Sequence, residues 1–159
     1  MATKYESLSP DLVWEAVRNN NAYLVKRKQA GGVQFSRDPL NLVNKHSRKY
    51  EGFVNPQAIG IQPDGNTVSL ITKTSKQNQP ASAYQTSSFS STTPSRKLYK
   101  SVVNSTAKKG YRADLRAQAV ARASAVKLSQ RETKKGAQEK KLRGSKARKA
   151  AAAVKEASS

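Results

Sequence analysis

The residues best suited to chemistry in this sequence are lysines and arginines that lie close to tyrosines in several short clusters. Cationic side chains contact phosphate groups, while tyrosine rings and guanidinium planes stack on exposed bases. One such cluster is typical of a solvated surface, but four of them and a basic tail indicate a surface that binds structured RNA or another polyanion. The candidate contact residues are Lys26, Arg27, Lys28, Lys45, Arg48, Lys49, Tyr50, Arg96, Lys97, Lys100, Lys108, Lys109, Tyr111, Arg112, Arg116, Arg122, Lys127, Arg131, Lys134 and Lys135.

The charge of the whole chain supports this interpretation. Its 159 residues include 30 Lys and Arg but only 10 Asp and Glu, which leaves a net charge of +20. Self-repulsion of this kind destabilises a compact monomer unless a polyanion screens it. Residues 1–95 hold 11 basic and 6 acidic side chains, whereas residues 96–159 hold 19 and 4. We therefore expect a folded body in the first part and basic appendages in the second.

A membrane partner is not expected. Binding to an anionic membrane surface requires a large apolar helix face, a lipidation site or a spanning segment. The sequence has no cysteine that could be acylated, and its apolar runs are short. No apolar stretch of signal-peptide length occurs near the first residue. We therefore expect a protein of the cytosol or nucleus, which the absence of cysteine also fits.

The inventory of catalytic side chains is poor. The chain has one histidine and four scattered aspartates, and no pair of them is spaced as an acid and base couple or as a metal site. No glycine-rich phosphate loop is present either. We therefore expect no enzyme, cofactor, metal or small-molecule substrate. His46 lies in a basic run, so we interpret it as a surface RNA contact or a passive loop residue rather than a general base.

Periodicity in the first part of the chain predicts one helix and two hairpins. Ser9, Pro10 and Asp11 are typical of a helix start, which predicts a helix over residues 10–18. Residues 22–27 and 33–36 have strand propensity on either side of a glycine pair, and residues 58–62 and 67–73 flank a Pro-Asp-Gly-Asn turn. Residues 1–74 are therefore predicted to form a small α+β body with an antiparallel sheet and an N-terminal helix.

The second part of the chain is predicted to contain a linker, two helices and a tail. Residues 75–95 are polar and rich in hydroxyl groups, so we expect a connector or an arm. Helices are predicted over residues 95–108 and 114–129, which makes residues 96–131 a unit of two basic helices. Residues 132–159 form a Lys/Ala-rich extended tail that we expect to be disordered or a frayed helix in isolation.

The third predicted helix, over residues 114–129, has a narrow apolar stripe beside a basic edge. On a helical wheel, Leu115, Ala119, Ala123 and Val126 fall together. The cations that flank one side of this stripe are Arg112, Arg116, Lys127 and Arg131. One interpretation is an amphipathic helix whose arginines face water. The alternative is that the stripe docks on the body while the basic edge faces phosphate.

The order of motifs resembles one known family. The motifs are Trp14 with Val17-Arg18-Asn19, Tyr23-Leu24-Val25-Lys26-Arg27, Phe35-Ser36, Pro39, Asn41-Leu42, Tyr50-x-Gly52, Tyr111-Arg112-x-Asp114-Leu115-Arg116, Arg122-Ala123-Ser124 and Ser129-Gln130. Together they resemble the eukaryote-specific family of large-subunit ribosomal protein number twenty-eight, over roughly residues 8–131. The chain departs from the family pattern at Ala113, where we expect proline, at Gly31-Gly32 and in its longer tail.

The resemblance implies a structural component of the cytosolic large ribosomal subunit, assembled in the nucleus or nucleolus. Its implied partners are large-subunit ribosomal RNA and neighbouring ribosomal proteins. A nuclear chromatin or architectural nucleic-acid-binding protein remains the alternative, because a Lys/Ala tail is also similar to the tails of linker histones. The first 95 residues, however, show no winged-helix pattern.

Overall fold

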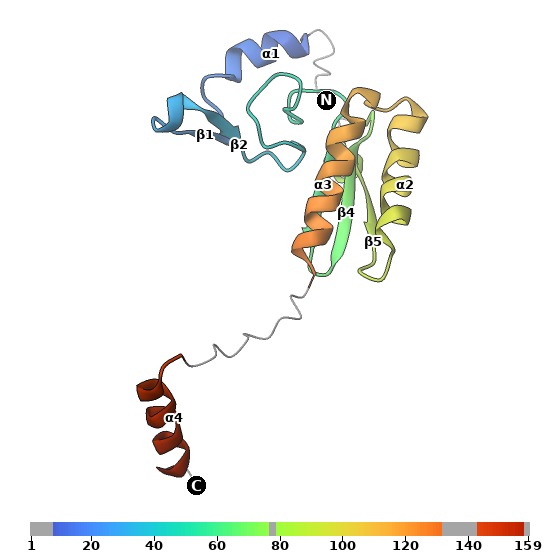
Figure 1. The fold of residues 1–159 in the computed structure, drawn as a ribbon. Coiled ribbons are helices and arrows are strands. Elements are labelled where there is room, and N and C mark those ends of the chain that lie inside the picture. The colour runs from blue at the N-terminus through green and yellow to red at the C-terminus, as the bar shows by residue number, and fades with distance from the viewer. Residues whose placement is uncertain (1–7, 77–78, 132–142, 158–159) are drawn as a thin grey trace.

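A computed structural model describes residues 8–76, 79–131 and 143–157. Figure 1 shows a small N-terminal unit, a sheet covered by two helices, and a last helix that lies apart from both. The helices and strands are α1 (Pro10–Val17), β1 (Leu24–Lys26), β2 (Gln34–Ser36), β3 (Ile59–Asp64), β4 (Thr67–Lys73), β5 (Tyr84–Phe89), α2 (Ser95–Ser105), α3 (Arg116–Ser129) and α4 (Ser145–Ala157). Four short 3₁₀ turns are η1 (Ala30–Gly32), η2 (Pro80–Ser82), η3 (Ala107–Lys109) and η4 (Ala113–Leu115). The predicted α+β class is confirmed.

The N-terminal unit consists of α1, β1 and β2, which form where the helix cap and the strand propensities predict them. The Ser9 hydroxyl accepts a hydrogen bond from the Asp11 N–H at 3.2 Å, which caps the first turn of α1. Strands β1 and β2 pair antiparallel with Val25 opposite Phe35. Phe35 also bridges to Lys45, so the chain after β2 returns along its other side.

The main sheet has three antiparallel strands in the order β3-β4-β5. The β3–β4 hairpin matches the prediction, and its turn places Gly65 at φ 55°, a conformation that glycine adopts without steric cost. Strand β5 falls within the polar segment expected to be a connector, so this part of the prediction differs from the structure. Residues 84–88 of β5 are all exposed, so the strand needs no alternation of apolar and polar side chains. It is held largely by its backbone pairing with β4.

Helices α2 and α3 cover one face of this sheet (Figure 1). The predicted apolar stripe of α3 is buried, with Ala123 fully inaccessible and Ala119 1% exposed. Leu98 and Val102, one helical turn apart on α2, are also fully buried. The core formed by these side chains and the sheet consists of Leu42, Ile59, Ile61, Val68, Leu70, Leu98, Val102, Leu115, Ala119, Ala123 and Val126. The small side chains of α3 let its backbone approach the sheet closely.

The tail ends in a helix. Residues 132–142, with the candidate contacts Lys134 and Lys135, lie outside the described residues. The division of the chain into four segments stays a prediction.

Within the described ranges, none of the helices combines the length and the apolar character that crossing a membrane requires.

Two glycines allow close approaches of the loop between β2 and β3, one within the loop and one against the sheet. A Cβ at Gly52 would overlap the Leu40 Cβ and lie 2.9 Å from the Leu40 carbonyl oxygen. A Cβ at Gly60 in β3 would lie 2.7 Å from the Pro39 carbonyl oxygen. The absence of a side chain at Gly52 therefore allows two parts of the loop to pack together, and its absence at Gly60 allows the loop backbone to lie directly on β3.

This contact predicts that Gly52→Ala destabilises the protein. The added methyl group must displace Leu40, and overpacking of this kind costs about 1 to 3 kcal/mol in the free energy of unfolding. Urea denaturation followed by far-ultraviolet circular dichroism measures the change. Ser124→Ala, at an exposed position of α3, is the control and should alter the midpoint little. Equal midpoints for Gly52→Ala and the control would contradict the close approach.

Candidate nucleic-acid interface

The exposed candidate residues form groups on separate elements. On α2, Arg96, Lys97 and Lys100 are exposed while Leu98 is buried, so the helix directs its cations away from the core. Lys26 ends β1, Arg27 and Lys28 follow it, and all three are exposed at the hairpin, although the Lys26 amine also donates a hydrogen bond to the Asn19 carbonyl oxygen at 2.6 Å. Figure 1 shows this hairpin and α2 on different sides of the body, so the fold does not bring the two groups together.

A third group lies where the β2–β3 loop meets the start of α3. This basic corner consists of Lys49, Lys108, Lys109 and Arg116, all of them exposed. Turn η3 packs against η4, directly before Arg116. The Lys49 amine lies 5.7 Å from the centre of the Tyr50 ring, and the Tyr50 hydroxyl accepts a hydrogen bond from Gln118 of α3 at 3.5 Å. The corner therefore has exposed cations next to a half-buried aromatic ring.

Arg112 occupies the middle of this corner but is bound to its own chain. Its guanidinium donates hydrogen bonds to the carbonyl oxygens of Gln57 at 3.0 Å and Lys49 at 2.9 Å, and it pairs with Asp114 at 2.9 Å. The hydrogen bond from Arg112 lowers the pKa of Asp114 and so favours its charged form. Arg112 also has φ 46°, an unusual conformation for a residue other than glycine. It therefore joins the β2–β3 loop to the start of α3.

Two other candidate cations, both on α3, also bind protein atoms. Arg122 donates to the carbonyl oxygen of Ile61 at 3.3 Å. Lys127 donates to the carbonyl oxygens of Ser91, at 3.4 Å, and Thr93. These bonds attach α3 to β3 and to the segment that follows β5. The fold therefore uses part of the basic edge of α3 internally.

Arg48 also binds atoms of its own chain, in this case side chains near α1. It pairs with Asp11 at 2.8 Å and donates a second hydrogen bond to the Asn55 side chain. Its side chain is 31% exposed, so part of the guanidinium still reaches solvent. Lys45 and Arg131, the remaining candidates within the described residues, are exposed.

Tyr111 is a packing residue. Its hydroxyl group can donate to the carbonyl oxygens of Lys73, at 2.8 Å, and Ala58, at 3.2 Å. The same hydroxyl oxygen accepts a hydrogen bond from the Ala58 N–H at 3.1 Å. Burial raises its pKa. These contacts hold the ring between the ends of β3 and β4, which leaves its hydroxyl committed to the sheet rather than to a ligand.

A buried polar network lies at the N-terminal side of the loop. The His46 Nε2 lies 2.8 Å from the Arg18 carbonyl oxygen, which can only accept, so Nε2 carries a proton. The other ring nitrogen lies 3.0 Å from a carboxylate oxygen of Glu51, which is fully buried and also accepts from the Ser36 hydroxyl at 2.9 Å. One proton therefore lies between His46 and Glu51. The interpretation of His46 as a surface RNA contact does not fit the 6% exposure of its side chain, whereas its position in a loop agrees with the alternative interpretation.

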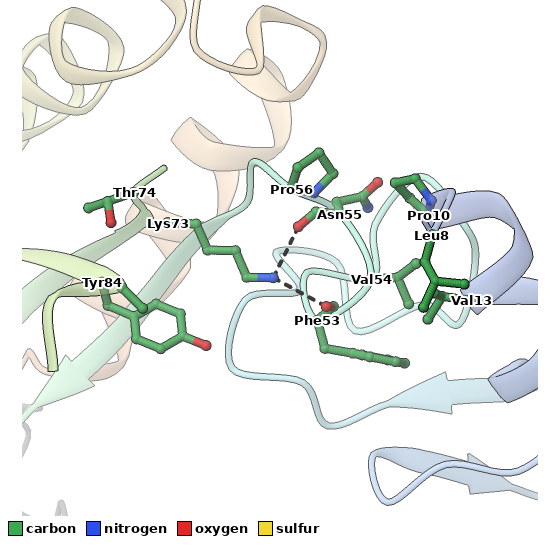
Figure 2. A pocket seen from close by; sticks show the side chains of 11 residues that line it. Leu8, Pro10, Val13, Phe53, Val54, Asn55, Pro56, Lys73, Thr74 and Tyr84 are labelled. Carbon is green, nitrogen blue, oxygen red and sulfur yellow. Dashed lines mark hydrogen bonds between the residues drawn. The ribbon is translucent and has the colours of Figure 1, made fainter. Parts of the chain in front are cut away.

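A cavity of about 620 Å³ opens between α1, the end of the β2–β3 loop and the start of β5. Figure 2 shows Lys73 pointing across it, with its amine 3.2 Å from the Phe53 carbonyl oxygen and 3.0 Å from that of Asn55. Burial lowers the pKa of Lys73. Tyr84 forms another wall and is half exposed. Neither side chain has a local sequence signal for this site, because the cavity is assembled from distant segments.

The described ranges contain no group of three or more His, Cys, Asp or Glu arranged to hold a metal ion.

Comparison with known proteins identifies the family of this chain. The model of the Ribosomal L28e protein family matches residues 12–129. The chain belongs to this family. The resemblance expected from the sequence motifs is thereby confirmed.

The alignment of this chain with two eL28 relatives covers nearly the whole length of each relative. The chain is 42% identical to the large ribosomal subunit protein eL28 of Schizosaccharomyces pombe over 131 residues, which are 80% of this chain and 97% of the relative. It is 35% identical to the protein of the same name from Dictyostelium discoideum over 134 residues, 84% of this chain and 97% of the relative. The residues matched by the L28e model run from within α1 to the end of α3 and leave out α4.

The buried carboxyl of Glu51 predicts a pH dependence of stability in this L28e chain. Burial raises the pKa of Glu51 above its ordinary value, despite hydrogen bonds from Ser36 and His46 that oppose the shift. The protonated carboxyl is therefore favoured in the fold. Its contribution to the free energy of unfolding is fully present below the unfolded-state pKa and is lost as pH rises through the folded-state value.

Glu51→Gln should remove this dependence. The stability of the wild-type protein relative to Glu51→Gln is expected to fall as pH rises above the ordinary pKa of a glutamate side chain, because only the wild type must then bury a charge. Urea denaturation at a series of pH values measures the difference. A difference that stays constant or grows with pH would contradict the assigned direction.

Proposed function

We propose that the protein is a structural constituent of the cytosolic large ribosomal subunit and that its exposed basic side chains hold segments of ribosomal RNA together. The observation that carries this proposal is membership of the L28e family, whose relatives are named large ribosomal subunit proteins. Ribosomal RNA and neighbouring ribosomal proteins would be its partners, with assembly in the nucleus or nucleolus. We expect no catalysis in this role.

The separation of the exposed cations supports a clamping role. The hairpin group, the basic corner and the α2 group lie on different elements of one body. A rigid core keeps groups of this kind at constant spacing, so each can neutralise phosphates on a different RNA segment. Since two RNA segments repel each other, a cationic body between them lowers the free energy of their close approach. Lys134 and Lys135 could extend this contact beyond α3.

The structure suggests which predicted contacts to rank highest. Arg116 and the lysines of the basic corner are exposed, whereas Arg112 uses its guanidinium on two carbonyl oxygens and a carboxylate. We therefore propose phosphate contact for the former and a positioning role for the latter. Tyr50 is the better candidate for contact with a base, since the Tyr111 hydroxyl bonds to β3 and β4 neighbours.

Sedimentation tests the proposed location. A tagged copy of the full chain is expected to sediment with large ribosomal subunits at low salt and to be released only at high salt, because many phosphate contacts must be screened together. Immunoblots of gradient fractions at rising salt measure this. A chain that sediments free of large subunits at low salt would contradict the proposal. Tighter binding to duplex DNA than to ribosomal RNA fragments at matched salt would instead favour the chromatin alternative.

The basic corner gives a sharper prediction. Combined Lys108→Ala, Lys109→Ala and Arg116→Ala should weaken binding to large-subunit ribosomal RNA. The slope of log affinity against log salt should flatten by about 0.7 to 0.9 for each phosphate that the variant no longer neutralises. Filter binding over a range of salt concentrations measures the slope.

Arg112→Ala is the matched comparison. It should lower the free energy of unfolding by about 1 to 3 kcal/mol, because it leaves two carbonyl oxygens and Asp114 without their donor. Its salt slope should remain close to that of the wild type. An unchanged slope for the triple variant would show that the basic corner only faces water.

A further inference from the structure

Strand β5 has one side without a partner. It pairs with β4 over six consecutive residues from Tyr84 to Phe89, and no other strand of the described residues lies on its far side. Residues 84–88 are all exposed. In an antiparallel pair, alternate backbone N–H and C=O groups point away from the partner. The outer side of β5 therefore presents a row of donors and acceptors to the surroundings.

This edge lacks the features that usually block further pairing. Exposed edge strands of soluble proteins commonly contain charged residues, proline or a bulge. Residues 84–89, with the sequence YQTSSF, contain no charge and no proline, and their register with β4 is unbroken. The opposite edge differs, because β3 contains Pro63 and Arg122 donates a hydrogen bond to the carbonyl oxygen of Ile61. Of the two edges of this sheet, the β5 edge is thus the one better suited to accept another strand.

The chemistry of the edge favours a polypeptide as its occupant. An extended chain at the usual spacing of about 4.8 Å offers alternating donors and acceptors that match those of β5. Phosphate groups of RNA only accept hydrogen bonds, and β5 has no cation with which to attract them. A second copy of this chain is disfavoured, because pairing would bring two bodies of net charge +20 together. A neutral or acidic segment avoids this repulsion.

A cavity lies at one end of the edge. Tyr84, the first residue of β5, lines the cavity shown in Figure 2, whose apolar walls include Val54 and Leu8. In recognition by strand addition, backbone hydrogen bonds provide affinity and neighbouring pockets select side chains. The cavity is therefore placed to accept an apolar side chain from the end of an added strand.

We propose that the free edge of β5 pairs with an extended, neutral or acidic segment of a different protein, with an apolar side chain of that segment in the cavity beside Tyr84. The inference rests on the proposed function, since the partner would be a neighbouring protein of the large subunit. It adds a specific protein-binding surface to a molecule whose other exposed groups suit RNA.

Hydrogen exchange tests the added strand. The full chain is compared free in solution and within purified large ribosomal subunits. The outward amides of β5 are expected to exchange at least about tenfold more slowly in the subunit, because they gain backbone acceptors. Exchange at unchanged rates in a chain that sediments with the subunit would overturn the inference and leave the proposed function standing. A chain that does not sediment with large subunits would overturn both.

A crosslink identifies the occupant. The natural chain has no cysteine, so Ser87→Cys provides a single thiol on β5 for a maleimide photo-crosslinker. In purified subunits the adduct is expected to contain one polypeptide other than this chain and to resist ribonuclease. Ser124→Cys, at an exposed serine on α3, is the matched control and should not give that polypeptide. An adduct with RNA, or with a second copy of this chain, would overturn the inference.

Discussion

The packing of α2 and α3 on the β3-β4-β5 sheet is the interaction on which the rest of the structure depends. A chain of net charge +20 has few apolar side chains to bury, and it concentrates them in this one layer. Leu98, Val102 and Ala123 are fully buried there. Burial of apolar surface is the main favourable contribution to folding, so this layer must offset the repulsion among the cations around it. The basic groups of the body are positioned from this core.

Part of the positive charge also holds the fold together. Arg112, Arg122 and Lys127 donate to backbone carbonyl oxygens of the loop, of β3 and of the segment after β5. Lys73 does the same for the loop beside the cavity. Backbone carbonyl oxygens receive hydrogen bonds in this way, and the segments are joined without further apolar residues. The basic composition therefore has two uses, which sequence composition alone does not separate.

The N-terminal unit relies on polar contacts more than on apolar burial. Its helix α1 has no fully buried residue, and it is joined to the loop through the Arg18 carbonyl, His46 and Glu51. Such a network is stable only while every member keeps its partner. The buried Glu51 carboxyl, whose pKa is raised by burial, is the origin of the pH dependence expected for this part of the molecule. The outer edge of β5 differs from this network, because its backbone groups have no strand partner among the described residues.

Signals contained within a few consecutive residues were sufficient to predict most elements. The cap at Ser9 predicted α1, the Pro-Asp-Gly-Asn turn predicted the β3–β4 hairpin, and the spacing of Leu115, Ala119, Ala123 and Val126 predicted the buried face of α3. The family motifs were likewise readable from the residues alone. Strand β5 was missed because its side chains bury too little to produce a periodic pattern.

Only the tertiary structure decided which charged groups are available. Arg112 and Arg116 look equivalent in the sequence, yet Arg112 bonds to Lys49, 63 residues away, while Arg116 is exposed. The side chain of His46 is likewise largely buried, with its ring bonded to the Arg18 carbonyl, 28 residues away. The physical reason is that secondary structure depends on neighbours within a turn or a strand. The availability of a charged side chain depends instead on donors and acceptors that folding brings from distant parts of the chain.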